Sequence, residues 1–323
     1  MAIDYDHSMR SLMPIVVFIT HHADEMLWNA LRSTLLSERW LRQLWVVHSN
    51  ASQVDLPSEF DSRVHYHWLG GNFGFASAVN WIYKHAEGPV FIINDDTILN
   101  ADCLEELYQA SLQYPTSVLQ PEIRLFDQPD TIENTGHYVG VDGNNSACQR
   151  GLQSTHSGIS NRLCFSGAAF WVPEVIYRHP KLQTMDTSLS PFGEDLDYAL
   201  RCIRYGFTIK CVHDATLLHR WGGSYERYSE QKVTWVESHR IQSKFRNLPM
   251  WMLLTAPLSS ALRYGIGLQD SRIPSGKSHS AAIASLRGIY QGYRSLPKAI
   301  RKRRQENFTV SDWEFTKLWW RQT

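Results

Sequence analysis

The sequence predicts an α/β fold in which helices flank a mostly parallel sheet, followed by a helical extension at the C-terminus. Short runs of apolar, β-forming residues alternate along the chain with segments of helical periodicity, which is typical of a parallel sheet covered by helices. Three of these runs, at 15–20, 44–48 and 90–94, end in small polar or acidic residues. Because ligands bind beyond the carboxyl ends of strands in open α/β sheets, these ends are candidate binding positions.

The expected elements follow one another in a regular order. Strands are predicted from apolar and β-branched runs, at 15–20, 44–48, 64–69, 90–94, 118–121, 165–172, 208–212 and 215–218. Helices are predicted from apolar residues at helical spacing, at 25–37, 76–85, 101–113 and from 194 to a cap at Gly206. Residues 131–158 are rich in Gly, Asn and Ser, so we expect hairpins or a mobile loop over the site.

Composition indicates a large core and an uneven charge distribution. Of the 323 residues, 43 % are hydrophobic, and the formal net charge is zero. Residues 271–305 nevertheless contain nine Lys or Arg and no Asp or Glu. The five cysteines include no Cys-x-x-Cys pair, which favours a reducing compartment over a disulfide framework. We expect neither a signal peptide nor a transmembrane helix, because the apolar runs are too short.

The most informative motif is the pair Asp95 and Asp96, which directly follows the apolar run at 90–94. Two adjacent carboxylates at the rim of a sheet repel each other unless a positive group lies beside them. We expect that group to be a divalent cation that holds a diphosphate. The alternative is that the pair caps the following helix or simply lies in a loop.

Three other segments offer polar groups at strand or helix ends. Residues 70–76 are rich in Gly and precede a helix, so their backbone N–H groups suit a phosphate, although an ordinary tight turn has the same composition. Glu194, Asp195 and Asp197 fall in the first turn of a helix, where acids also complement the helix dipole. His219 follows an apolar run and could return to the carboxylate pair as a metal ligand. The Gly-x-Gly-x-x-Gly and P-loop patterns are missing, which argues against a dinucleotide oxidoreductase or a P-loop kinase.

In their order along the chain, these motifs resemble the family-2 inverting glycosyltransferases with the GT-A fold, and especially bacterial rhamnosyl- and galactofuranosyltransferases. The segments that carry the likeness are the strand ending in Thr20 and residues 72–80, 93–97, 193–197, 219–224 and 244–247. The resemblance implies transfer of one sugar from dTDP-rhamnose or a UDP-hexose or UDP-galactofuranose to a hydroxyl of a glycan or lipid-linked acceptor, in cell-surface polysaccharide synthesis. The Gln-x-x-Arg-Trp pattern of processive synthases is missing, which favours a single addition.

The resemblance also implies roles for individual residues. Asp96 and His219 would hold Mg²⁺ or Mn²⁺, Asp195 would be the catalytic base, and Glu194 and Trp221 would contact the acceptor. The nucleotide-sugar pocket would be lined by residues at the strand ends, namely Thr20, Ser49, Asn50, Asn72, Gly74, Asn80, Asn94 and Asp95. Ser49 stands where the family usually has an Asp that reads the base, so the sequence leaves uracil and thymine open.

The likeness ends near residue 247, and this sets the expected domain boundaries. We expect a leader over 1–13, a GT-A domain over 14–247 and a basic helical region over 248–323. The basic region either forms a helical subdomain with a solvated face or docks on an anionic membrane, where a lipid-linked acceptor would lie. The protein would then be cytoplasmic or peripheral on the inner face of the plasma membrane. No recognisable nucleic-acid-binding module is present.

Two other functions remain open at this point. One is a sugar-nucleotide-binding protein without activity, in which Asp195 would be redundant. The other is a sugar-nucleotide nucleotidyltransferase, which normally has a Gly-rich basic loop after the first strand. Residues 21–24, which read His-His-Ala-Asp, do not provide such a loop.

Overall fold

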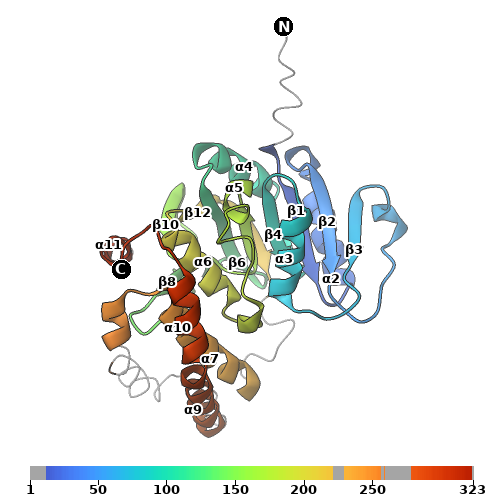
Figure 1. Cartoon of the computed structure of the whole chain (residues 1–323). Helices are drawn as coiled ribbons and strands as arrows, with labels where there is room; N and C mark the ends of the chain where they lie inside the picture. The colour runs from blue at the N-terminus through green and yellow to red at the C-terminus, as the bar shows by residue number, and fades with distance from the viewer. Residues whose placement is uncertain (1–11, 221–228, 256–257, 259–277, 322–323) are drawn as a thin grey trace.

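The computed structural model describes residues 12–220, 229–255, 258 and 278–321, and it has a ten-stranded sheet at its centre (Figure 1). The main strand order is β10-β12-β6-β11-β4-β1-β2-β3, with β5 paired to β12 and β7 paired to β6. Six of the eight strands in this order point the same way, and β10 and β11 run against them. The expectation of an α/β fold with a mostly parallel sheet is therefore confirmed.

Most strands form where apolar, β-branched runs were expected, whereas β5, β7 and β10 lie outside those runs. The parallel half of the sheet consists of β1 (Ile15–Thr20), β2 (Gln43–His48), β3 (Val64–Trp68) and β4 (Val90–Asn94). The other half consists of β5 (Thr97–Leu99), β6 (Ser117–Leu125), β7 (Gln128–Asn134), β10 (Ile159–Arg162), β11 (Ala169–Val172) and β12 (Thr208–His219). A separate hairpin contains β8 (His137–Val139) and β9 (Asn145–Ala147).

Helices cover both faces of the sheet, because successive side chains of each strand point to opposite faces. Val16 and Phe18 pack against α2 (Glu25–Leu35) and α4 (Cys103–Gln113). The opposite face packs against α3 (Phe75–His85), α5 (Glu174–Tyr177) and α6 (Glu194–Arg204). Short 3₁₀ turns lie at Glu38–Trp40, Ser58–Phe60 and Thr187–Leu189.

Three expected elements differ from those observed. Residues 208–212 and 215–218 belong to one strand, β12, whose pairing with β6 is irregular between Val212 and Thr216. The strand expected at 165–172 begins only at Ala169, because Ser166 and Gly167 accept or donate bonds outside the sheet ladder. Residues 131–158 form most of β7 and the β8–β9 hairpin, in agreement with the expected hairpins.

The described residues after the sheet include the helices α7 (Glu230–Asn247), α9 (Ser278–Arg294), α10 (Leu296–Gln305) and α11 (Asp312–Trp320), and residues 250–255 are also helical. Figure 1 shows α7, α9 and α10 gathered at the side of the molecule away from β3. On α11, Phe315 is buried in the same core as α3 and α6. α11 thus packs against the core of the sheet domain, and a domain boundary at residue 247 stays a prediction. Within the described residues, no helix has both the length and the apolar character needed to cross a bilayer.

Candidate active site

The first part of the site is the turn between β4 and β5, which contains Asp95 and Asp96. Thr20 ends the neighbouring strand β1, and its Oγ1 donates a hydrogen bond of 2.5 Å to Oδ2 of Asp95. Burial raises the pKa of Asp95 to about 7; the bond from Thr20 opposes this shift and the charge of Asp96 adds to it. A cation placed beside the turn would stabilise the ionised form of a carboxyl group in this position.

His219 lies at the end of β12 and faces this turn. Its Nε2 is 3.2 Å from Oδ1 of Asp96, and its Nδ1 is 2.8 Å from Oε2 of Glu133 on β7. Burial lowers the pKa of His219, but the carboxylates of Asp96 and Glu133 outweigh burial and raise it to about 10. The two carboxylates therefore favour a positive charge between them.

Asp96 and His219, which the sequence proposed as metal ligands, have the chemistry to hold a divalent cation. Oδ1 of Asp96 is buried, and within the described residues its one polar neighbour is Nε2 of His219 at 3.2 Å, so a cation between these two atoms would take the place of a proton. A neutral His219 that donates Nδ1–H to Glu133 presents the lone pair of Nε2 toward Asp96. Among the described residues no group of three or more His, Cys, Asp or Glu forms a metal site. Two protein ligands would leave the other positions for phosphate and water, which is the usual arrangement for Mg²⁺.

The second part of the site is the start of α6, where Glu194 and Asp195 follow Gly193. Gly193 has φ +133°, and a Cβ there would lie 2.8 Å from Cβ of His239, so the approach of α7 requires glycine. Oε2 of Glu194 is buried and has no hydrogen-bond partner among the described residues, while Oε1 accepts from Oγ of Ser190 at 3.2 Å. Burial, reinforced by the charge of Asp195, raises the pKa of Glu194 to about 8.

A short stretch before β11 joins the two parts. The backbone N–H of Gly167 donates to Oδ2 of Asp195 at 3.3 Å, and the backbone N–H of Asn94 donates to the carbonyl of Ala168 at 2.9 Å. Adjacent residues 167 and 168 therefore contact Asp195 on one side and the acidic turn on the other. Both acid pairs therefore lie at the carboxyl edge of the parallel strands, and for Asp95 and Asp96 the sequence had indicated this position.

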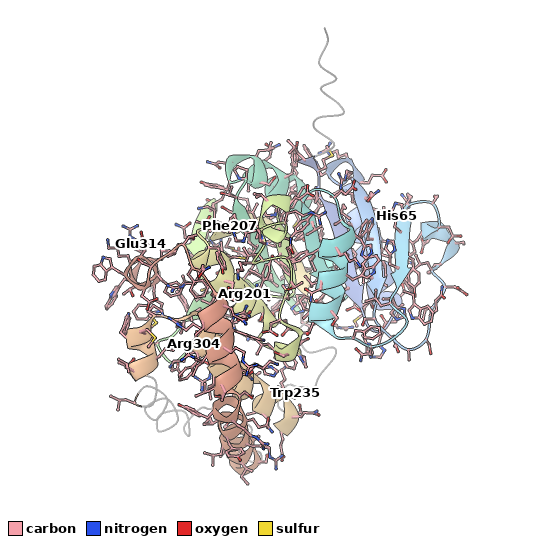
Figure 2. The ribbon with its side chains drawn as sticks, viewed as in Figure 1. His65, Arg201, Phe207, Trp235, Arg304 and Glu314 are labelled. Carbon is pink, nitrogen blue, oxygen red and sulfur yellow. The ribbon has the colours of Figure 1, made fainter. Side chains whose placement is uncertain are left out.

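Asp197, the third acid of α6, points into the protein instead. It is fully buried and accepts from Arg201 (2.9 Å), Arg246 (3.0 Å) and Asn247 (2.8 Å). The segment at 244–247, which contributed to the family resemblance, thus clamps α7 to α6. Side chains fill the space between the sheet and these helices in Figure 2, where Arg201 is labelled.

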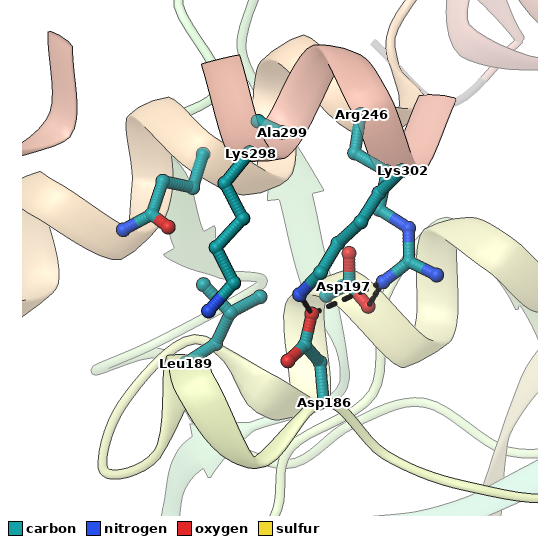
Figure 3. A pocket seen from close by; sticks show the side chains of 8 residues that line it. Asp186, Leu189, Asp197, Arg246, Lys298, Ala299 and Lys302 are labelled. Atoms are coloured by element: carbon teal, nitrogen blue, oxygen red, sulfur yellow. Dashed lines mark hydrogen bonds and ion pairs between the residues drawn. The ribbon is translucent and has the colours of Figure 1, made fainter. Parts of the chain in front are cut away.

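A pocket beside this clamp is a structural feature and lies away from the acid pairs. Its lining comes from the 3₁₀ turn before α6 and from α6, α7 and α10, and it includes Asp186, Asp197, Arg246, Lys298 and Lys302 (Figure 3). Lys302 pairs with Asp186 there, and Arg246 lies 3.3 Å from the same carboxylate. The pocket is therefore lined by ion pairs, and through the pair of Lys302 with Asp186 they attach α10 to the turn before α6.

The other residues expected in the donor pocket differ in which of their polar groups already form hydrogen bonds within the protein. Oγ of Ser49 bonds to the backbone of residues 71 and 73, and the amide of Asn50 bonds to the carbonyl of His21. Gly74 has φ +77° at the start of α3. Asn72 is exposed, and its Oδ1 accepts only the backbone N–H of Gly74, at 3.3 Å.

Asn80, which was expected in the donor pocket, braces the segment before α6. Its Nδ2 donates to the carbonyl of Met185 at 3.0 Å and its Oδ1 accepts from the N–H of Met185 at 2.7 Å. These two bonds use one of the two N–H donors of the amide, so a role at the nucleotide stays a prediction.

Glu133 is the residue that sequence analysis missed. It lies within 131–158, where hairpins or a mobile loop were expected, and no motif distinguishes it from the other acids of the chain. Trp221, the second expected acceptor contact, lies outside the described residues.

Comparisons with known proteins concern the sequence of the first half of the chain and the fold. Residues 15–165, somewhat under half of the chain, match the family described as Glycosyl transferase family 2. Among solved structures, GalNAc-T7 with UDP, GalNAc and Mn²⁺ superposes with a TM-score of 0.62 at 10 % identity, over 90 % of this chain and 57 % of that one. Residues 1–349 of S. aureus TarS give a TM-score of 0.49 at 12 % identity, over 93 % and 94 % of the two chains. No curated protein matches.

The chain thus spans little more than half the length of GalNAc-T7, and at this identity the likeness concerns the fold. That fold is the GT-A fold, as expected. Together with the match over residues 15–165, it supports a glycosyltransferase.

Proposed function

We propose that this protein is an inverting glycosyltransferase that moves one sugar from a nucleotide-diphosphate sugar to a hydroxyl of a glycan or lipid-linked acceptor. The observation that carries the proposal is the presence of two acid pairs at one edge of the sheet, one facing an imidazole and one at a helix N-terminus. The first suits a diphosphate with its cation, and the second suits a proton acceptor. We keep the rhamnosyl, galactofuranosyl and UDP-hexosyl donors as the candidates, in cell-surface polysaccharide synthesis.

Asp195 would act as the general base. An acceptor hydroxyl must lose its proton as it attacks the anomeric carbon, and a carboxylate can take that proton. The N–H of Gly167 holds one carboxylate oxygen and the N–H of Leu196 holds the other, so the side chain is oriented before substrate binds. The N-terminus of α6 also stabilises negative charge at this position.

Glu194 would orient the acceptor as a hydrogen-bond donor. Because its pKa is raised to about 8, its carboxyl is mostly protonated at neutral pH and can donate to an acceptor oxygen. Two neighbouring acids held in different protonation states are a recurrent arrangement in enzymes. A single carboxylate base and direct displacement would invert the anomeric configuration.

Asp96 and His219 would hold Mg²⁺ or Mn²⁺, with Glu133 fixing the orientation of the imidazole. When bound, the ion would offset the charge that develops on the departing diphosphate. Asp95, which is anchored by Thr20, would contact the ion or the ribose. Asn72, Gly74 and Asn94 remain in the proposed donor pocket, while Ser49 and Asn50 shape the loops around it.

The test is a thermal-shift screen of UDP- and dTDP-sugars with and without Mn²⁺, followed by turnover with the donor that binds. We expect binding and turnover only with the ion, and loss of both in Asp96→Ala. Asp102→Ala, an exposed acid on the next helix, is the matched control and should behave as wild type. Full turnover in excess EDTA would contradict the metal assignment. Donor binding without transfer to any acceptor would favour a binding protein, and sugar-nucleotide synthesis from a sugar phosphate would favour a nucleotidyltransferase.

A further inference from the structure

Helix α9 has two faces of opposite character. Its inner face packs closely on α7 through Ala284, Gly288 and Gly292; a Cβ at Gly288 would lie 2.5 Å from the carbonyl oxygen of Thr234. At about 100° per residue these three positions share one side of the helix. The opposite side bears large apolar residues at spacings of three and four, and they are exposed: Ile283 (46 %), Leu286 (67 %), Tyr290 (66 %) and Tyr293 (40 %).

Exposed cations flank this apolar stripe. Arg287 and Arg294 are exposed on α9, and they lie two turns apart on one side of the stripe. On α10 the exposed basic residues are Lys298, Arg301 and Arg304. The described residues from 278 to 305 contain no Asp or Glu, so no internal acid neutralises these groups along either helix.

Not every basic residue of this region faces outward. Lys302 pairs with Asp186, and Arg303 donates to the carbonyl of Leu248 at 2.7 Å. The run at 301–304, which is the densest cluster of positive charge in the sequence, is thus divided between attachment of α10 and the outer surface. The charge available to a partner comes from α9 and from the outer side of α10.

We infer that the outer face of α9 docks on an anionic lipid surface, with its apolar stripe at the level of the headgroups and its arginines against lipid phosphates. An exposed apolar face rimmed by cations is the pattern of interfacial helices, and exposed patches of this kind mark interaction sites. A second copy of the chain is a poorer partner, because a symmetric contact would bring two acid-free basic surfaces together. Lipid supplies both the apolar layer and the opposite charge.

The contacts of α7 connect this surface to the site. α7 packs on α9, and His239 of α7 approaches the carbonyls of Pro191 (3.2 Å) and Phe192 (3.0 Å) just before the acid pair of α6. A docked α9 would therefore hold Asp195 at a set position relative to the membrane. This last consequence rests on the proposed transferase function with a lipid-linked acceptor; the docking itself does not.

The experiment measures co-sedimentation of the full chain with vesicles of phosphatidylcholine alone or mixed with phosphatidylglycerol. Wild type should bind the anionic vesicles and be released as salt rises, because screening shortens to about 8 Å at physiological ionic strength. Leu286→Ser/Tyr290→Ser and Arg287→Glu/Arg294→Glu should each lose binding, the charge variant by at least about 5-fold per arginine. Because all four side chains are exposed, the thermal midpoints should stay near that of wild type.

Matched controls change the same chemistry elsewhere. Leu36→Ser/Leu112→Ser removes two exposed leucines from the face covered by α2 and α4, and Arg63→Glu/Lys84→Glu reverses two exposed charges near β3 and on α3. Both should bind as wild type. Equal binding to neutral and anionic vesicles, or undiminished binding by the α9 variants, would overturn the inference. So would light scattering that shows a wild-type dimer made monomeric by Leu286→Ser/Tyr290→Ser. The vesicle experiment contains no sugar donor. Its result would therefore be unchanged if the proposed transferase function were wrong.

Discussion

The two acid pairs at the sheet edge have similar sequences and different surroundings. Each contains one carboxyl group whose burial raises its pKa, Asp95 to about 7 and Glu194 to about 8. The pair in the β4–β5 turn faces the imidazole of His219, while the pair on α6 is held by backbone N–H groups. The two pairs therefore differ in the groups around them and not in their own chemistry. An imidazole beside the carboxylates favours binding of a cation, whereas backbone N–H groups favour a carboxylate that accepts a proton.

The third acid of α6 extends the comparison within one helix. Asp195 and Asp197 are two residues apart, which places them about 200° apart around the axis. Asp195 consequently faces the sheet edge, whereas Asp197 enters a buried network of Arg201, Arg246 and Asn247. Substitutions at four acidic residues, Asp195, Asp197, Glu133 and Glu194, distinguish their expected roles.

Asp195→Asn should have the largest effect. The amide preserves size but cannot accept the proton, and loss of a general base typically lowers turnover by about 10²- to 10⁴-fold. Donor affinity should change little, because the diphosphate is proposed to lie at the other acid pair. Turnover, donor affinity and the anomeric configuration of the wild-type product are measured together. Near-normal turnover in the variant, or a retained configuration, would refute the assignment.

Asp197→Ala should mainly reduce stability. Removing one partner of a buried ion pair leaves the other charge uncompensated and typically costs about 3–5 kcal/mol. Here it would leave the guanidinium groups of Arg201 and Arg246 without their shared carboxylate. Denaturant unfolding gives the change, and Asp195→Asn serves as the comparison with little loss expected. If Asp197→Ala were as stable as wild type, the ion pairs of Asp197 with Arg201 and Arg246 would not be needed for stability.

Glu133→Gln should weaken the metal site without removing a ligand. Loss of an outer carboxylate that orients a metal-binding histidine commonly costs about 10- to 100-fold in metal affinity. Turnover should recover at saturating Mn²⁺, which a loss of folding would not allow. Glu122→Gln is the control, because Glu122 forms a buried pair of the same kind with His213, at 3.0 Å. Unchanged Mn²⁺ affinity in Glu133→Gln would count against Asp96 and His219 as ligands.

Glu194→Gln should have the smallest effect, on the pH dependence of stability. The pKa of Glu194 rises from an ordinary 4.5 to about 8 on folding, so the folded state binds the extra proton. Stability from this group is present below pH 4.5 and is lost as pH rises toward 8. Thermal midpoints from pH 5 to 9 should therefore fall less steeply in Glu194→Gln than in wild type. The raised pKa of Asp95 also makes stability fall as pH rises, and it does so equally in wild type and in Glu194→Gln. If the thermal midpoints of the two proteins changed in parallel with pH, Glu194 would be ionised over the whole range.

The sequence by itself determined the buried parallel strands, such as β1 and β4, and their polar ends. Runs such as Val90–Asn94 are local, and a buried strand of β-branched residues leads to the sheet edge whatever packs around it. Asp96, Asp195 and His219 could be proposed as site residues because they lie near such strand ends or in the first turn of a helix, within motifs that resemble a known family. The two faces of the sheet follow equally from alternation along each strand.

Tertiary structure alone decided which polar groups are free for chemistry. Glu133 meets His219 across 86 positions of sequence, and Asn80 meets Met185 across 105. In the same way, Lys302 of the basic run turns inward to Asp186 while Arg301 stays exposed. The physical reason is that a hydrogen bond or an ion pair depends on distances of about 3 Å between atoms. Local patterns place a residue on a strand or a helix, but such distances are set only when distant segments pack together.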